Sequence, residues 1–160
     1  MTPNLMSAST WRTLAAGVDC PFDAPRASST DHWQHVATLA CSSLYLPRNQ
    51  AYRGHCVLVL DLRHATRPDQ LTRQEWQSFC DDLYVAQHAI ERVVRPDHIN
   101  VATLGNVMPH LHWHIVPRYE HDPRWGAPIW SSDLANEPNT RLADADFAAL
   151  LEELQGALAS

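Results

Sequence analysis

Residues 110–116 have the sequence His-Leu-His-Trp-His-Ile-Val, in which three histidines stand two positions apart with apolar residues between them. Side chains alternate between the two faces of a strand, so the segment predicts a strand with His110, His112 and His114 on one face and apolar side chains on the other. A row of three imidazoles suits a polar site better than a core. The segment therefore favours a sheet with one packed face and one chemical face.

Two chemistries compete for this row of histidines. Neutral imidazole is the commonest nitrogen ligand of zinc, and three histidines with a water form a catalytic zinc centre. Alternatively, the central imidazole attacks phosphorus without a metal, while its neighbours donate hydrogen bonds to the phosphoryl oxygens and the leaving group. No acidic residue lies within the row to act as a general base, which counts against the zinc enzyme. The regular apolar interleaving also argues against three histidines without a role.

The periodicity of apolar residues elsewhere predicts an α+β fold. Thr72 and Glu75 form a capping box, and apolar residues then recur at helical spacing until Pro96, which predicts one long helix. We also expect a helical turn over 10–16, strands over 36–46 and 56–62 that form a hairpin, strands over 99–104 and 110–117 that form an antiparallel pair, and a C-terminal helix over 144–158. The prediction is an antiparallel sheet with the long helix on one face.

Composition sets limits on the function. A chain of 160 residues with 45% hydrophobic content can bury a sizeable core, so we expect residues 1–160 to form a single domain. The formal net charge of −6 argues against binding to a nucleic acid polymer, which requires a basic surface. All twelve basic residues are arginines, so a P-loop lysine and a Schiff-base mechanism are excluded. Imidazole, arginine or backbone N–H groups must then meet the charge of any phosphate.

The cysteines and the hydropathy of the chain predict a cytoplasmic protein. The four cysteines show no close-spaced pairs, and the N-terminal residues lack the pattern of a signal peptide. No apolar run reaches the roughly 18 residues that a bilayer crossing needs. We therefore expect reduced thiols and no membrane partner.

The context of the histidine row resembles a known family. Residues 104–119, Leu-Gly-Asn-Val-Met-Pro-His-Leu-His-Trp-His-Ile-Val-Pro-Arg-Tyr, look like the histidine triad (HIT) motif, His-φ-His-φ-His-φ-φ with φ apolar, in bacterial members of that family. The Gly54-His55 pair that opens a hydrophobic strand resembles the upstream element of the family. The resemblance covers a core of about residues 33–120, with N-terminal and C-terminal extensions packing on it, and implies a HIT-like sheet of about five strands.

The resemblance implies a nucleotide hydrolase or nucleotidyl transferase without a cofactor. The substrate would be a nucleoside phosphate conjugate cleaved at its α-phosphate, such as a dinucleoside polyphosphate, a phosphoramidate or an adenylate. By this resemblance His112 would be the nucleophile that forms a nucleotidyl-histidine intermediate. His114 would donate a hydrogen bond to the bridging oxygen, and His110 would orient the row. No metal role is implied for the triad.

The same resemblance assigns substrate contacts and marks departures from the family pattern. Asn106 would lie near the phosphates and His55 would reach the pocket from the neighbouring strand, while Arg118 is a candidate for phosphate contact. Many members carry an acid or amide for the ribose eight residues before the position of His55, where this chain has Pro47, so Asn49 is the alternative.

A second departure concerns turnover. Val107 replaces a small hydroxyl residue of the family that contacts a phosphate oxygen or the leaving group. A nucleotide-binding module with little turnover therefore stands as the alternative to an enzyme, and a zinc site of the three histidines as a less favoured one.

Three further expectations concern the regions around the core. Some relatives carry an N-terminal Cys-x-x-Cys zinc element, of which Cys20-Pro-Phe-Asp23 keeps one cysteine, so a structural zinc is not expected, although Asp23 could ligate. Trp125 and Trp130 either shape the leaving-group pocket or anchor their loop. Family members are commonly homodimers, so a homodimer is expected. The six histidines without such a context are interpreted as solvated polar residues, namely His32, His35, His64, His88, His98 and His121.

Overall fold

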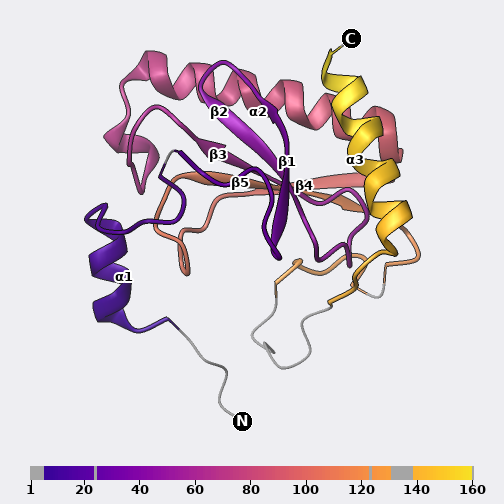
Figure 1. Ribbon diagram of the computed structural model, residues 1–160, viewed down its shortest axis with the longest axis horizontal. Coiled ribbons are helices and arrows are strands. Elements are labelled where there is room, and N and C mark those ends of the chain that lie inside the picture. The colour runs from indigo at the N-terminus through magenta and orange to yellow at the C-terminus, as the bar shows by residue number, and fades with distance from the viewer. Residues whose placement is uncertain (1–5, 24, 123, 131–138, 160) are drawn as a thin grey trace.

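The computed structural model describes residues 6–23, 25–122, 124–130 and 139–159. Its elements in chain order are α1 (Ala8–Ala15), β1 (Trp33–Thr38), β2 (Ser42–Pro47), β3 (Cys56–Leu60), the short 3₁₀ helix η1 (Pro68–Gln70), α2 (Arg73–Val94), β4 (His98–Ala102), β5 (His112–Arg118) and α3 (Asp144–Ala159) (Figure 1).

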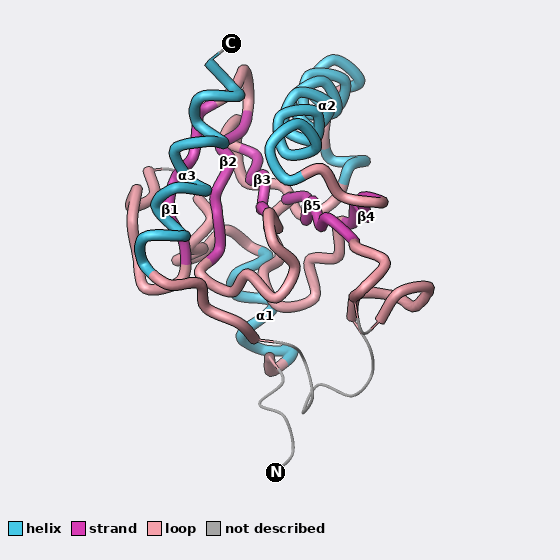
Figure 2. Tube along the Cα trace, turned by 90° about the vertical axis from the view of Figure 1, so that its right-hand side faces the viewer, coloured by secondary structure: helices cyan, strands magenta, loops and turns pink. Residues whose placement is uncertain are grey.

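The five strands form one antiparallel sheet in the order β1-β2-β3-β5-β4. Helix α2 packs on β2, β3 and β5, and α3 packs on α2 and β1. The buried side chains of both helices share one apolar cluster with those of the strands, so the two helices cover the same face of the sheet. Helix α1 lies on the side of the molecule away from α2 (Figures 1 and 2). The predicted α+β architecture with a long helix and a C-terminal helix is therefore confirmed.

The long helix begins where the capping box predicts. The Thr72 side chain accepts a hydrogen bond from the Glu75 backbone N–H, and the Glu75 carboxylate accepts one from the Thr72 N–H at 2.7 Å. The helix ends at Arg95, whose φ of 47° is left-handed and is followed by Pro96. Local sequence is sufficient to fix both ends of α2.

The single strand predicted over 36–46 is wrong. The structure has two strands there, β1 and β2, which form a hairpin, and β2 rather than the whole segment pairs with β3. The cause is Asp82, a buried residue of α2. Its carboxylate accepts hydrogen bonds from the N–H groups of Ala40 (3.1 Å) and Cys41 (2.9 Å) and from the Ser42 hydroxyl (2.6 Å). The backbone N–H groups of the turn thus find their acceptor on a side chain distant in the sequence, and the turn has no glycine, proline, asparagine or aspartate of its own to predict it.

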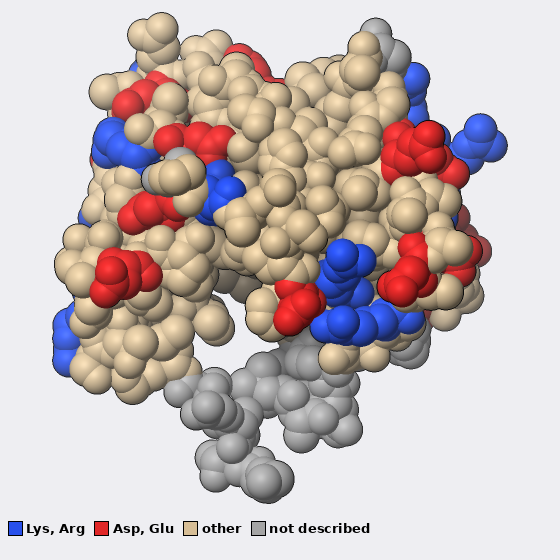
Figure 3. All heavy atoms as spheres, viewed as in Figure 1, with Lys and Arg blue, Asp and Glu red and all other residues tan. Residues whose placement is uncertain are grey.

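The face seen in Figure 3 does not divide into an acidic and a basic region. Acidic and basic side chains are interspersed over the face seen in Figure 3. Among the described residues, no helix combines the length and apolarity that a bilayer crossing requires.

Candidate active site

His112 and His114 project from β5 on the sheet face opposite the helices. Between them, the Trp113 ring points the other way and packs against Trp76 and Phe79 of α2, with ring centroids 5.7 and 6.0 Å apart. The register pairs His112 with Val59 and His114 with Val57 of β3, so these two valines flank the imidazoles on the same face. The predicted division of β5 into a chemical face and a packed face is confirmed for these residues.

His110 lies outside the strand, because β5 begins at His112. The predicted start of the strand at residue 110 is therefore two residues early. The His110 backbone N–H donates to the Met108 carbonyl, and the Leu111 N–H donates to the Ala65 carbonyl. Neither residue therefore joins the hydrogen-bond ladder between β4 and β5. The His110 side chain is only 2% exposed, and its Nε2–H donates to the Leu60 carbonyl at 2.8 Å.

A chain of hydrogen bonds fixes the proton on each imidazole. The His112 Nδ1 is 2.6 Å from the His110 carbonyl oxygen, which can only accept, so Nδ1 carries the proton and Nε2 presents its lone pair. The His114 Nε2 lies 3.2 Å from His112 Nε2 and must then donate. The neutral His114 ring has its lone pair on Nδ1, which accepts from the Nε2–H of His55 at 3.2 Å. His55, directly before β3, thus completes the row.

Burial keeps these rings neutral. It lowers the pKa of His112 below the usual value, and it lowers that of His55 to about 4. The pKa of His114 falls to about 3, because burial is reinforced by the neighbouring rings of His55 and His112. A neutral His112 has the free electron pair that a nucleophile requires.

Two aromatic rings that are distant in sequence enclose the imidazoles. The Phe22 ring lies edge-on to His112 with a centroid separation of 5.2 Å, and the Trp130 ring lies edge-on to His114 at 4.8 Å. Trp130 therefore contributes to the site wall, whereas Trp125 is 46% exposed. The role of Phe22 escapes sequence reasoning, because nothing in the N-terminal segment predicts its contact with a strand some ninety residues later.

Arg118, at the end of β5, is buried among hydrogen-bond partners of its own. It is 3% exposed, and its guanidinium donates to the Asp122 carboxylate (2.5 Å), the Asn100 side chain (2.7 Å) and the carbonyls of Arg124 and Ala127. These bonds occupy the group that phosphate contact would need. Arg118 thus anchors Asp122, Arg124 and Ala127 beside the end of β5, and its contact with a phosphate stays a prediction.

The two predicted asparagines are both exposed. The exposed Asn49 accepts hydrogen bonds from the backbone N–H groups of Ala51 and Thr140, and so ties the β2–β3 loop to the chain before α3. Asn106 is exposed in the loop between β4 and β5, and no hydrogen bond joins its amide to another described residue. Val107 beside it is 63% exposed.

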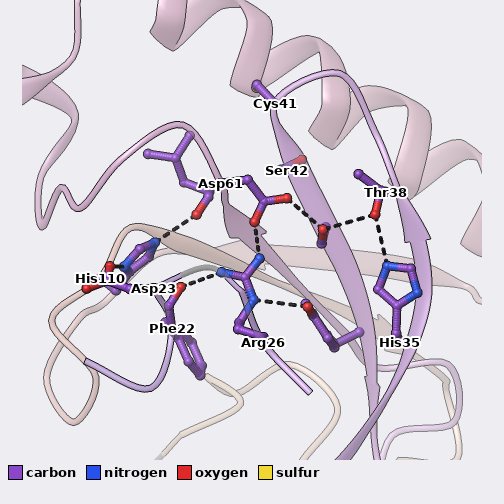
Figure 4. Close-up of polar contacts among 12 residues, drawn as sticks. Phe22, Asp23, Arg26, His35, Thr38, Cys41, Ser42, Asp61 and His110 are labelled. Atoms are coloured by element: carbon purple, nitrogen blue, oxygen red, sulfur yellow. Dashed lines mark hydrogen bonds and ion pairs between the residues drawn. The ribbon is translucent and has the colours of Figure 1, made fainter. Parts of the chain in front are cut away.

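The structure also brings together Cys20, Asp23, His64 and His110. One ligand atom of each lies within 4.8 Å of the others. The interpretation of His64 as a solvated side chain is wrong, because its Nδ1 lies 3.0 Å from the Asp23 carboxylate and its Nε2–H donates to the Ala15 carbonyl. Within the part of the chain that the structure describes, these four residues form a group that could hold a metal, and one of them, His110, belongs to the triad. Figure 4 shows Asp23 and His110 side by side.

Two cavities border the site. A groove of about 840 Å³ runs between β4 and residues 125–130 and is lined by Val101, Ala102, Trp125 and Trp130 among others. A second cavity, of about 30 Å³, lies among Phe22, Trp33, Tyr45, Val57 and Val59 beside the triad. Only the groove is within the range of about 300–1,000 Å³ that small-molecule sites occupy.

A sheet of this order under one long helix, with alternating histidines on its open face, defines the histidine triad class of α+β proteins. The HIT domain model matches residues 35–121, more than half of the chain. The protein therefore belongs to the HIT domain family. No curated protein matches the chain.

Solved structures of proteins from several organisms share this fold. A histidine triad protein from Bradyrhizobium japonicum is 20% identical with a TM-score of 0.71, covering 79% of this chain and 91% of that one. A zinc-bound family member from Mycobacterium smegmatis is 15% identical with a TM-score of 0.57, covering 92% and 90%. The diadenosine triphosphate hydrolase of Plasmodium falciparum is 15% identical with a TM-score of 0.53, covering 82% and 84%. These similarities show the fold.

Proposed function

We propose that this protein is a nucleotide hydrolase or nucleotidyl transferase that acts through a nucleotidyl-histidine intermediate on His112. The observation that carries the proposal is the hydrogen-bond chain from His55 through His114 to His112, which places a lone pair on His112 Nε2 beside the N–H of His114. A nucleophile and a hydrogen-bond donor thus lie 3.2 Å apart on one open face.

The reaction follows from these proton positions. When a phosphoryl group enters, the His114 N–H turns to one of its oxygens and releases the lone pair of His112. A bond forms between His112 Nε2 and the α-phosphorus, and the bond from phosphorus to the leaving group breaks with its electron pair. The His110 carbonyl, hydrogen-bonded to His112 Nδ1–H at 2.6 Å, stabilises the resulting imidazolium. Attack on phosphorus by water, or by the hydroxyl of an acceptor, then forms a P–O bond and breaks the N–P bond, whose electron pair returns to His112. The departed leaving group takes up the proton that the attacking group loses, so neutral His112 is restored.

The substrate class remains that of the family. We expect a nucleoside phosphate conjugate such as a dinucleoside polyphosphate, a phosphoramidate or an adenylate. The Plasmodium hydrolase acts on diadenosine triphosphate, and a structurally similar Sulfolobus tokodaii protein is described as nucleotide-binding. Asn106 is exposed and free to approach the phosphates, whereas Pro47 offers no group to a ribose. The groove beside Trp130 has room for the leaving group.

A cytoplasmic location and a homodimer are two further predictions. All four cysteines are free thiols, which fits a reducing cytoplasm. Strand β4 forms an edge of the sheet and exposes Val101, which suits pairing with a second copy in the expected homodimer.

The alternatives receive different support. A nucleotide-binding module with little turnover fits the departures at Pro47 and Val107. A zinc centre of the three triad histidines fits poorly, because His110 directs its Nδ1 toward Cys20 and Asp23 and not toward the other two rings.

The test compares wild type, His112→Ala and His88→Ala, the last a control at an exposed histidine of α2. Each is incubated with adenosine and guanosine dinucleoside polyphosphates, phosphoramidates and acyl-adenylates, and released mononucleotide is measured. We expect turnover by wild type and the control and a loss of roughly 10⁴-fold in His112→Ala, with substrate affinity retained. Equal rates in all three proteins contradict the proposal, and tight binding without turnover favours the binding module.

A further inference from the structure

Gln50 lies buried in the loop between β2 and β3, and its side-chain amide joins the two ends of that loop. It is 3% exposed. Its Nε2 donates to the Pro47 carbonyl at 2.8 Å and to the His55 carbonyl at 3.1 Å, and its Oε1 accepts from the Gly54 N–H at 2.8 Å. Carbonyls only accept and a backbone N–H only donates, so these partners fix the orientation of the amide. Both amide protons and the amide oxygen are thus bonded to the backbone at the end of β2 and directly before β3.

The backbone at Gly54 is also confined by packing. Its φ of 86° is left-handed, a conformation that favours glycine. A Cβ at this position would lie 2.9 Å from both methyl groups of Val94 at the end of α2 and 3.2 Å from Cγ of Pro117 in β5, closer than packed carbons approach. Hydrogen bonds to Gln50 and close contact with α2 and β5 therefore hold the backbone of residues 54 and 55 in place.

The position of His55 decides whether its ring reaches His114. The distance from His55 Nε2 to His114 Nδ1 is 3.2 Å, so a shift of about 0.5 Å takes this contact beyond the usual hydrogen-bond length. Without that donor, the His114 proton is free to occupy Nδ1, which leaves a lone pair on Nε2 facing the lone pair of His112 Nε2 at 3.2 Å. The arrangement of protons along the row is then lost.

We infer that Gln50 is a positioning residue for the triad. Through its hydrogen bonds to Gly54 and His55 it holds the His55 ring within reach of His114, and so it determines the protons that His114 and His112 carry. Gln50 acts on His112 only through His55. The consequence for turnover rests on the proposed function, whereas the proton positions do not.

The hydrogen bonds of the Gln50 amide are tested first in the unchanged protein. In ¹⁵N-labelled protein, we expect the side-chain NH₂ protons of Gln50 to exchange with solvent about 100-fold or more slowly than those of Gln77, an exposed residue of α2. Exchange at the rate of Gln77 would overturn the inference, whatever the variants show.

The imidazole protons are tested by ¹⁵N NMR of histidine-labelled protein, which distinguishes a protonated ring nitrogen from a bare one. Wild type should carry protons on Nδ1 of His112 and on Nε2 of His114 and His55. Gln50→Met fills a similar volume without an amide, so we expect His114 to show both tautomers. Gln77→Met, the matched control, should give the wild-type spectrum. An unchanged His114 tautomer in Gln50→Met contradicts the inference, because a loss of stability alone does not move a proton between ring nitrogens.

A second variant covers the case in which Gln50→Met does not fold. Gln50→Glu keeps the shape of the side chain and the acceptor for the Gly54 N–H, but its carboxylate has no proton to donate to the carbonyls of Pro47 and His55. We expect the same change in the His114 spectrum as in Gln50→Met. A wild-type spectrum in either folded variant overturns the positioning role.

Turnover adds a double-mutant cycle with His55. Because Gln50 acts through His55, Gln50→Met should lower kcat about tenfold with KM retained, and should cause no further loss in the His55→Gln background. Losses that add in the double variant contradict a route through His55. Absence of turnover in wild type would overturn the proposed function, and the exchange and tautomer measurements would still decide the role of Gln50.

Discussion

At the scale of single residues, the protonation of the site follows from acceptors that cannot donate. The His110 carbonyl determines the tautomer of His112, which determines that of His114, which in turn requires His55 to donate. A change at any one ring alters the proton position on the next. We therefore propose that His55, which lies outside the motif, positions His112 through the proton that it donates to His114.

The neutral, buried rings of His55 and His114 make stability depend on pH. In the unfolded chain the pKa of a histidine is about 6.5. In the folded protein the pKa of His55 is about 4 and that of His114 is about 3. Between these values the unfolded state binds more protons, so the free energy of unfolding is highest above about pH 6.5 and falls as the pH drops toward 4.

Urea unfolding at pH 7 and pH 5 measures this effect. We expect the midpoint to be lower at pH 5 than at pH 7 in wild type and in His88→Gln, and to fall less in His55→Gln, which removes one of the imidazoles with a lowered pKa. An identical pH dependence in His55→Gln and His88→Gln would show that burial of His55 does not control this slope.

At the scale of elements, the sequence predicts those helices and strands that local residues determine, and it does not predict those that depend on contacts between residues far apart in the chain. Helix α2 could be predicted because Thr72 and Glu75 mark its start, and the open face of β5 because its histidines alternate with apolar residues. The β1–β2 turn could not, because its hydrogen-bond partner is Asp82, some forty residues away. The same applies to Phe22 and to the group of Cys20, Asp23, His64 and His110, because the spacing of these residues in the sequence does not show that they lie close together.

Asp82 offers a direct test of how the β1–β2 hairpin is held. Its carboxylate is 5% exposed and accepts from two backbone N–H groups and the Ser42 hydroxyl. Asp82→Ala leaves these donors buried without a partner, so we expect a loss of about 3 kcal/mol in the free energy of unfolding. Urea denaturation measures the loss, with Asp81→Ala, an exposed neighbour on the same helix, as control. Equal stability of the two variants would mean that the turn does not need the carboxylate.

At the scale of the whole molecule, the sheet separates packing from chemistry. Helices α2 and α3 lie on one face of the sheet (Figure 1) and share its apolar cluster. The other face presents the triad, which is bordered by Phe22 from the N-terminal extension and Trp130 from the segment after β5. Arg118 anchors that later segment through Asp122 and backbone carbonyls. The two segments outside the family core therefore border the face on which the triad lies.

The most direct test of the central claim is intact-mass spectrometry of the protein after rapid alkaline quenching of its reaction with an adenosine phosphoramidate or diadenosine polyphosphate. Our account predicts a wild-type species heavier by one adenylyl group, with the group located on His112 by peptide mapping and absent from His112→Ala. Turnover without any such species, or an adduct on another residue, would contradict covalent catalysis by His112.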